Sequence, residues 1–381
     1  MNPVVVHLVE TYLARSEIFI HNYVASHVGW DPVVLCEFSA NENELPIGRR
    51  VVVTGPKSKR QPTWWGNEAV RLLTGRSLWH RRAARAIAPL RPAVLHAHFG
   101  QMGWAGLPVA RWVGIPLVTT FYGYDMSVLP HLPRWQRRLR RLFQEGDLFL
   151  AEGPCMQRRL VELGCPAAKV RVQRIAIHTD RYPRWQPTGG KLPVVLFVGR
   201  FAEKKGLLDA LAAVLEVSRR GRAVRFRVVG DGPLRPSAEQ FVAVHGLGGT
   251  VEFLGMQPHS EVLRELAAAD VFIHPSRTAS NGDTEGGAPT IVLEAQAVGV
   301  PLVTTEHADI PNVAPTGPGV YLSPEGAVGP LADNLWRALA ERVGSSSEFV
   351  RARHHVGREV LELEAYYAVL TNQSELPHAG R

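Results

Sequence analysis

The chain carries at residues 282–301 the sequence GDTEGGAPTIVLEAQAVGVP, and the rest of the chain is interpreted around it. The first half is a glycine-rich loop, and the second half is an apolar helix that Pro289 opens and Gly299 closes. Glu285 lies in the loop and Glu294 in the helix, where a buried carboxylate needs hydrogen-bonding partners. Free N–H groups at a helix start attract phosphate. The stretch predicts a site for a ligand with hydroxyl groups at both ends and an anion in the middle.

Composition predicts a two-domain cytoplasmic protein. The chain has 381 residues, more than a single hydrophobic core commonly supports. No apolar run approaches the roughly 18 residues of a membrane span, and the N-terminus reads as a first strand rather than a secretory leader. The cysteines, Cys36, Cys155 and Cys165, have no metal-binding spacing and suit a reducing compartment.

Short apolar runs alternate with helical patterns along both halves of the chain. Examples are Val4–Val9 and Ala93–Phe99 in the first half, and Val194–Val198 and Val271–His274 in the second. A connection rich in proline and glycine, Tyr182–Pro193, separates the halves. The alternation predicts an α/β protein of two doubly wound parallel sheets that face each other. Ligands bind such sheets at the carboxyl ends of the strands, so the cleft between the domains is the expected site.

These patterns set the expected domain boundaries. We expect one Rossmann-like domain over residues 1–186 and a second over residues 187–345. Residues 346–381 contain one long helical pattern, from about Ser347 to Thr371.

The formal net charge of +8 is concentrated in basic helices. The clearest, residues 134–143, combines arginines with Trp135, Leu139, Leu142 and Phe143. Such a helix can rest on an anionic membrane surface, or it can be a solvated helix with its apolar side in the core. Beyond charge there is no nucleic-acid-binding signature, so we expect no nucleic-acid partner.

A second anion-binding candidate is FVGRFAEKKG at residues 197–206, which joins a buried strand to a helix. Lys204 and Lys205 fall at the helix start, where the helix dipole disfavours cations unless an anion lies between. Arg200 ends the strand and can grip phosphate oxygens with its guanidinium group. The alternative is a solvated turn rich in charge. The Gly230–Gly232 turn and His274 end neighbouring strands and are weak signals alone.

In the first half, His98 and the run Tyr122–Asp125 follow separate strands. Parallel strands deliver such residues to one edge of the sheet, so they form a candidate site. The alternative is a histidine satisfied within the core.

Several motifs together resemble glycosyltransferase family 4, retaining enzymes of the GT-B fold that take a sugar from a nucleotide-diphosphate donor. The resemblance covers nearly the whole chain and is closest to enzymes of bacterial exopolysaccharide and surface-polysaccharide assembly. The motifs that carry it are HAHFG at 96–100, TTFYGYD at 119–125, the run at 147–182, FVGRFAEKKG, VGDGPL at 229–234, VEFLG at 251–255, ADVFIHPS at 269–276 and the opening stretch.

The resemblance implies a donor site in the second domain, with no essential metal and no cofactor besides the nucleotide sugar. Arg200 and Lys205 would hold the diphosphate, Glu294 the ribose, and Glu285 the transferred sugar; UDP is favoured over GDP as the nucleotide. The full donor-binding set would be Gly199, Arg200, Lys205, Gly230, Asp231, Gly232, Glu285, Gly286, Gly287, Ala288, Pro289, Thr290 and Glu294.

The resemblance also implies an acceptor-binding first domain and a C-terminal helix that crosses back onto it. The acceptor-side residues would be His98, Tyr122, Gly123 and Asp125. His98 and Tyr122 join Glu285, Arg200 and Lys205 as the candidate catalytic residues.

Two features depart from the family pattern. Tyr122 stands where members usually have a histidine, and a tyrosine is a poor base near neutral pH. The two glutamates are nine positions apart, Glu285 to Glu294, where the family has eight. We expect Gly286, the residue at the family's spacing, to bulge and return Glu285 to its place, because glycine tolerates unusual dihedral angles.

The sequence therefore predicts a retaining hexosyltransferase that acts on a saccharide acceptor, lipid-linked or part of a surface polysaccharide, at the inner face of the cell membrane. A small secondary metabolite as acceptor stays open. A sugar-nucleotide 2-epimerase of the same fold is an alternative, although its acidic residue set is not found. A non-catalytic sugar-nucleotide-binding protein is another, motivated by Tyr122 and the shifted Glu285.

Overall fold

The computed structural model describes residues 2–12, 17–40, 49–52, 78–187, 189–190 and 192–371. The chain divides into two compact units of parallel β-sheet and helices. The first unit comprises Met1–Glu152, Gln157–Ala176 and Val356–Arg381, and the second comprises Gly153–Met156 and Ile177–His355. Among the described residues, no helix is long and apolar enough to cross a membrane.

The first unit contains a seven-stranded sheet in the order β3-β2-β1-β4-β5-β6-β7, and all its pairings are parallel. The strands are β1 (Val4–Tyr12), β2 (Asp31–Ser39), β3 (Arg50–Val52), β4 (Val94–His98), β5 (Leu117–Thr120), β6 (Leu148–Ala151) and β7 (Val170–Val172). The helices are α1 (Ile18–Ala25), α3 (Leu78–Ile87), α4 (Gly100–Val113), α5 (Tyr124–Ser127), α6 (Pro133–Glu145), α7 (Pro154–Glu162), which begins in the second unit, and α15 (Val356–Leu370).

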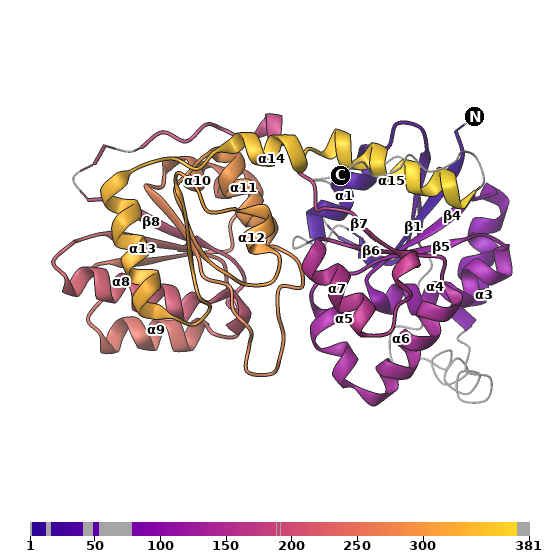
Figure 1. Ribbon diagram of the computed structural model, residues 1–381, viewed down its shortest axis with the longest axis horizontal. Helices are drawn as coiled ribbons and strands as arrows, with labels where there is room; N and C mark the ends of the chain where they lie inside the picture. The colour runs from indigo at the N-terminus through magenta and orange to yellow at the C-terminus, as the bar shows by residue number, and fades with distance from the viewer. Residues whose placement is uncertain are drawn as a thin grey trace. The chain divides into compact units, whose positions relative to one another are not determined.

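Helices cover both faces of this sheet. Helix α15, yellow in Figure 1, lies across one face, where Val360, Leu363 and Tyr367 pack against strand residues such as Val5 and Val118. Helices α3, α4 and α6 lie on the opposite side in the same view. The apolar runs of the sequence are therefore buried on both sides, as parallel sheets require.

The second unit contains a six-stranded parallel sheet in the order β10-β9-β8-β11-β12-β13. Its strands are β8 (Val194–Val198), β9 (Arg225–Val229), β10 (Val251–Gly255), β11 (Val271–His274), β12 (Leu302–Thr305) and β13 (Val320–Ser323). Its helices are α8 (Leu207–Arg219), α9 (Arg235–Val244), α10 (His259–Ala268), α11 (Thr290–Val298), α12 (Ile310–Val313), α13 (Val328–Glu341) and α14 (Ser347–Arg353).

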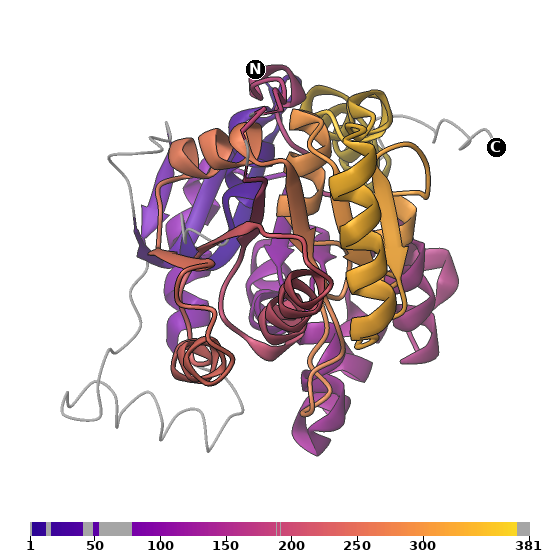
Figure 2. The same ribbon diagram turned by 90° about the vertical axis from the view of Figure 1, so that its left-hand side faces the viewer.

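The core of the second unit lies between the sheet and helices α8, α9 and α13. Figure 2 shows α13, in yellow, running alongside the strands of this sheet. Phe197, Phe201 and Phe226 are fully buried in this core, and burial of such a side chain stabilises the fold by about 1.5–3 kcal/mol. The packing fixes the strand ends on which the candidate site is built.

The boundary between the two units does not fall at residues 186–187, where the sequence predicted it. The chain passes from the first unit to the second between Ala176 and Ile177. The segment expected as a linker is bound to the second unit instead, because the backbone N–H of Trp185 donates to the carbonyl of Val298 at 2.8 Å and its indole N–H to that of Ala269 at 2.7 Å.

The predicted single C-terminal helix is wrong, since α14 and α15 are separate helices. Helix α14 belongs to the second unit and α15 to the first. The chain breaks the helix at His354, whose carbonyl accepts a hydrogen bond from Ile177 N–H at 2.9 Å. The return to the first unit therefore begins at Val356, ten residues beyond the expected boundary at 346. Residues 372–381 of the expected segment lie outside the described residues.

The basic helix predicted at residues 134–143 is α6. Its apolar side chains, Trp135, Leu139, Leu142 and Phe143, are buried. Arg138 lies over the rings of Trp104 and Trp135, at 5.8 and 4.8 Å from the ring centroids. The apolar side of this helix therefore belongs to the core, and only its arginine side is presented outward; contact with an anionic membrane stays a prediction.

Candidate active site

In the second unit, the candidate residues gather at the carboxyl edge of the sheet. Gly199 and Arg200 directly follow β8, Ser276 follows β11, and His307 follows β12. The loop that contains Glu285 leads from the end of β11 to α11 and meets the same edge. This is the edge at which doubly wound sheets bind ligands.

The two lysines of the KKG run have different partners. Both lie in a short 3-10 turn, Glu203–Lys205, that precedes α8, rather than in the helix itself. Lys204 is buried, and its Nζ donates to Asp283 Oδ1 at 3.1 Å and to the carbonyl of Thr284 at 2.9 Å. Lys205 Nζ contacts Glu285 Oε2 at 2.8 Å. Lys204 therefore anchors the loop, and Lys205 is the cation that faces the candidate site.

Both carboxylate oxygens and the backbone N–H of Glu285 have hydrogen-bonding partners. Oε1 accepts a hydrogen bond from Ser276 Oγ at 3.0 Å, and the backbone N–H donates to His307 Nε2 at 3.2 Å. Burial acts to raise the pKa of this carboxyl group, but the charge of Lys205 and the neighbouring basic groups outweigh it and hold the pKa at about 2. Glu285 is therefore an ionised carboxylate with a fixed orientation.

Gly286, the residue at the family's spacing, has the unusual backbone conformation that we expected of it. This residue has a φ of 78°, in the left-handed region that glycine enters without strain. Glu285 lies against Lys205 and Ser276; that Gly286 returns it to the family's place stays a prediction. Helix α11 then begins at Thr290 with Pro289 as its N-cap, one position later than predicted, and ends before Gly299.

His274, a weak signal in the sequence, has an unsatisfied nitrogen in this site. The side chain is fully buried, and its Nδ1 lies 3.1 Å from Ser276 Oγ. Because the Ser276 hydroxyl donates its hydrogen to Glu285, Nδ1 of His274 must donate and Nε2 carries a lone pair. Among the described residues Nε2 has no hydrogen-bond partner, and a Cβ built on Gly199 would lie 3.5 Å from it. Burial lowers the pKa of His274 to about 3, so the ring is neutral.

Glu294 lies within α11 and is buried. Its Oε1 accepts hydrogen bonds from Tyr182 Oη at 3.2 Å and from His259 Nε2 at 2.9 Å. These two contacts hold one oxygen and orient the other, and they satisfy the need for partners that the sequence implied. Glu294 and Glu285 thus have separate sets of neighbours.

The Gly230–Gly232 turn packs against the chain itself. A Cβ on Gly230 would lie 2.0 Å from the carbonyl oxygen of Gly199, and one on Gly232 would lie 2.8 Å from the nitrogen of Phe201. The carbonyl of Asp231 accepts a hydrogen bond from Phe201 N–H at 2.8 Å. The glycines therefore allow two strand-end loops to touch; their contact with a donor stays a prediction.

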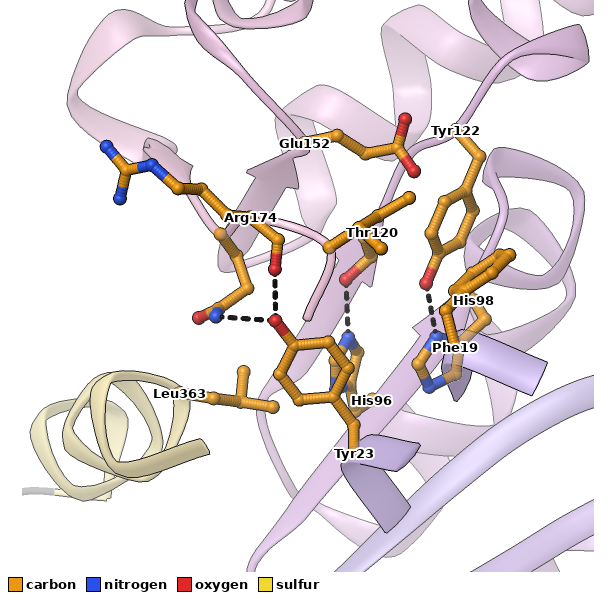
Figure 3. A pocket seen from close by; sticks show the side chains of 11 residues that line it. Phe19, Tyr23, His96, His98, Thr120, Tyr122, Glu152, Arg174 and Leu363 are labelled. Atoms are coloured by element: carbon orange, nitrogen blue, oxygen red, sulfur yellow. Dashed lines mark hydrogen bonds between the residues drawn. The ribbon is translucent and has the colours of Figure 1, made fainter. Parts of the chain in front are cut away.

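A pocket in the first unit lies at the carboxyl edge of its sheet (Figure 3). Its lining residues lie at the ends of β4, β5, β6 and β7 and on α1 and α15. Glu152 extends toward Tyr122. The lining residues are Phe19, Tyr23, His96, His98, Thr120, Tyr122, Glu152, Gln173, Arg174, Ile175 and Leu363.

His98 and Tyr122, which the sequence placed on one edge, are directly hydrogen-bonded in this pocket. Tyr122 Oη lies 2.7 Å from His98 Nδ1. Burial lowers the pKa of His98 to about 3 and raises the pKa of Tyr122 well above 10. Both groups are neutral near pH 7, so they can orient a hydroxyl group but neither carries a charge.

Asp125 and Gly123 do not line this pocket. Asp125 is fully buried, and its carboxylate accepts hydrogen bonds from the backbone N–H groups of Gly100 at 2.7 Å and Tyr122 at 3.0 Å. Gly123 precedes the short helix α5. Both residues shape the loop that presents Tyr122, and their contact with a ligand stays a prediction.

Sequence reasoning missed several residues of both sites. Glu152 directly follows β6 and His307 lies two residues beyond β12, so the strand-end rule that identified His98 could have found them. Ser276 belongs to the HPS run, whose signal was weak because no partner could be seen for it.

Two family models match the chain. Residues 25–181 match the model described as Glycosyltransferase Family 4, and residues 192–341 match the model described as Glycosyl transferases group 1. These ranges fall largely in the first and the second unit, respectively.

Relatives support the same family. WcaL of Salmonella typhimurium, a candidate colanic acid biosynthesis glycosyltransferase, is 31% identical over 353 residues, which cover 88% of this chain and 82% of the relative. AmsK of Erwinia amylovora, an amylovoran biosynthesis glycosyltransferase, is 34% identical over 281 residues, 73% of this chain and 69% of the relative.

Solved structures show the fold. HepE of Anabaena, solved in complex with UDP and glucose, matches with a TM-score of 0.77 at 16% identity and covers 97% of this chain and 100% of its own. Sucrose-phosphate synthase of Thermosynechococcus elongatus matches with a TM-score of 0.75 at 16% identity, over 98% and 100%. The fold is GT-B, with two parallel-sheet α/β domains. With both halves matched by family models and a relative above 30% identity over most of its length, the chain belongs to glycosyltransferase family 4.

Proposed function

We propose that this glycosyltransferase moves a hexose from a nucleotide-diphosphate donor, with UDP favoured, to a saccharide acceptor in polysaccharide assembly, and that it retains the anomeric configuration. The names of the two bacterial relatives support the polysaccharide, and the UDP and glucose in the structure of HepE support the donor class. The observation that carries the proposal is the partly buried ion pair between Lys205 and Glu285, a residue of the loop that leads into α11.

The pair explains how the second unit would bind a diphosphate. Arg200 is exposed at the end of β8, and the first N–H groups of α11 have no side-chain cap. A diphosphate that approaches this edge would take Lys205 as a counter-charge in place of Glu285. Fixed cations and helix N–H groups stabilise the negative charge that develops on a departing diphosphate, which is the electrostatic form of catalysis. Charge neutralisation by the protein makes an essential metal unnecessary, and we propose that the reaction needs none.

Freed from Lys205, Glu285 would remain in the same place with its hydrogen bond from Ser276. An ionised carboxylate there can accept hydrogen bonds from sugar hydroxyl groups. The lone pair of His274 Nε2 offers a second acceptor at the same edge. The donor sugar would therefore be oriented by acceptors that are fixed before it binds.

A panel of UDP-, GDP- and dTDP-sugars tests the donor class by thermal unfolding. A ligand that binds only the native state raises the melting temperature. At a free concentration of a hundred times Kd, it adds roughly 2.7 kcal/mol to the free energy of unfolding. We expect UDP-hexoses to give the largest rise. A larger rise with GDP-sugars would contradict the choice of nucleotide, and no rise with any of the three would contradict the proposed donor site.

A further inference from the structure

Five side chains of the first unit form a continuous line of hydrogen bonds that starts at the pocket and ends on α15. Tyr122 Oη lies 2.7 Å from His98 Nδ1, and His98 Nε2 lies 3.0 Å from His7 Nδ1. His7 Nε2 lies 3.0 Å from His27 Nε2, and His27 Nδ1 lies 2.9 Å from Glu364 Oε1. We call these residues the histidine line.

The carboxylate end fixes the direction of every hydrogen bond. Burial acts to raise the pKa of Glu364, but His27 and the backbone N–H groups of Val28 and Gly29 outweigh it and lower the pKa. An ionised carboxylate only accepts, so His27 Nδ1 donates to it, and a neutral His27 then has a lone pair on Nε2. His7 must fill that lone pair by donating from its own Nε2.

The same rule continues to the pocket. A neutral His7 that donates from Nε2 accepts at Nδ1, so His98 donates from Nε2 and accepts at Nδ1. The hydrogen that His98 accepts is the hydroxyl hydrogen of Tyr122. Tyr122 therefore turns its hydrogen inward and leaves oxygen lone pairs for a ligand in the pocket.

Burial favours the neutral form of His7 and His98. His7 is fully buried and His98 is 2% exposed, and burial lowers the pKa of each below its usual value. The side chain of His27 has no exposed surface. With one hydrogen on each ring and an ionised Glu364, a single arrangement of hydrogens satisfies all four contacts.

A metal site is the other arrangement that clustered histidines suggest. His7, His96 and His98 offer ring nitrogens within 4.8 Å of one another. All six nitrogens are already engaged, since His96 contacts Tyr367 Oη at 2.5 Å and Thr120 Oγ1 at 2.7 Å. The chemistry of the cluster thus favours hydrogen bonds among its members over metal coordination.

We propose that His7, His27 and Glu364 are positioning residues that fix Tyr122 as a hydrogen-bond acceptor for a substrate hydroxyl group. The inference deepens the proposed function and rests on it, because a saccharide acceptor supplies such a hydroxyl group. It also gives a role to the tyrosine that stands where family members usually have a histidine. The oxygen of Tyr122 presents lone pairs to the pocket, as an imidazole nitrogen can.

Nitrogen-15 NMR of histidine-labelled protein tests the direction of the line without any substrate. Signals are assigned by single His→Gln variants at positions 7, 27 and 98. We expect hydrogen on Nε2 of His7 and His98 and on Nδ1 of His27 at pH 7.5. Hydrogen on Nδ1 of His7 or His98 would overturn the proposal, and so would a stoichiometric metal ion bound to these rings in the purified protein.

A double-mutant cycle then tests whether the line acts through Tyr122. We expect His27→Gln to lower acceptor-dependent turnover about threefold to tenfold in the wild-type background and to have no further effect in Tyr122→Phe. His96→Gln is the matched control, since His96 is equally buried but lies outside the line, and its effect should be the same in both backgrounds. If His27→Gln had the same effect in both backgrounds, His27 would have only a structural role and the proposal would be overturned.

The outcomes of these experiments distinguish a failure of the positioning role from a failure of the proposed function. If the protein transfers no sugar, the proposed function fails, while NMR still decides the direction of the line. If transfer proceeds but the coupling with Tyr122 is absent, the positioning role fails and the proposed function stands. Melting temperatures of each variant show whether a loss of turnover reflects unfolding.

Discussion

Replacement of Lys205 by alanine is expected to lower kcat/KM for the donor about 10²–10³-fold, the usual loss when one fixed group that stabilises transition-state charge is removed. Lys205 contacts Glu285 at 2.8 Å in this structure and is the cation that a diphosphate would meet. The variant loses that counter-charge and also leaves the Glu285 carboxylate unpaired where it repels phosphate. Both KM and kcat should therefore worsen, as initial rates over a range of donor concentrations would show.

The loss of the counter-charge of Glu285 in Lys205→Ala could lower stability as well as activity, so this variant needs a control. Removal of one partner of a buried ion pair destabilises a protein by about 3–5 kcal/mol. The double variant Lys205→Met/Glu285→Gln removes both charges and should recover much of the melting temperature while staying inactive. Lys205→Arg keeps the charge and should retain part of the activity. Unchanged donor kinetics in Lys205→Ala would remove Lys205 from the phosphate site.

Replacement of Glu294 by alanine is expected to weaken the binding of free UDP about 10–100-fold, because hydrogen bonds to a charged group contribute about 1.5–3 kcal/mol. Tyr182 and His259 hold Oε1 of this carboxylate, so the carboxylate is oriented before a ribose arrives. Turnover at saturating donor should change less than affinity, since the ribose lies away from the reacting bond. Titration calorimetry with UDP measures the affinity directly.

Tyr182→Phe is the matched control for Glu294. It removes one hydroxyl group that donates to the carboxylate and keeps the ring in place. A loss of about twofold to tenfold is expected, the size of one neutral hydrogen bond. Wild-type affinity for UDP in Glu294→Ala would contradict the ribose assignment.

The fold could be predicted from the sequence because its signals are local. Buried parallel strands give continuous apolar runs, and Val194–Val198 and Val271–His274 occur where they were expected. The break at His354 was not predictable, because it depends on where the chain returns to the first unit and not on the helical pattern around it. The sequence patterns predict no element between β12 and α14, where the structure has α12, β13 and α13.

The candidate sites were predictable only as far as strand ends reveal them. His98 with Tyr122, and Lys205 with Glu285, are pairs that the sequence assigned to common edges and that the structure places in contact. Contacts between distant segments gave no such signal. Nothing in the sequence indicated that His98 would contact His7, or that His7 would contact His27. Nor did it indicate that the carboxylate of Asp125 would accept hydrogen bonds from backbone N–H groups.

The most direct test of the central claim is to determine the anomeric configuration of the product. NMR spectroscopy measures it, in the presence and in the absence of EDTA. The donor that thermal unfolding selects is incubated with free and lipid-linked saccharide acceptors. An α-linked donor should give an α-linked product at a rate that the chelator does not change. A β-linked product would contradict retention, and loss of activity in EDTA would contradict the metal-free site. Formation of an epimer of the donor, or binding of the donor with no product from any acceptor, would contradict glycosyl transfer itself.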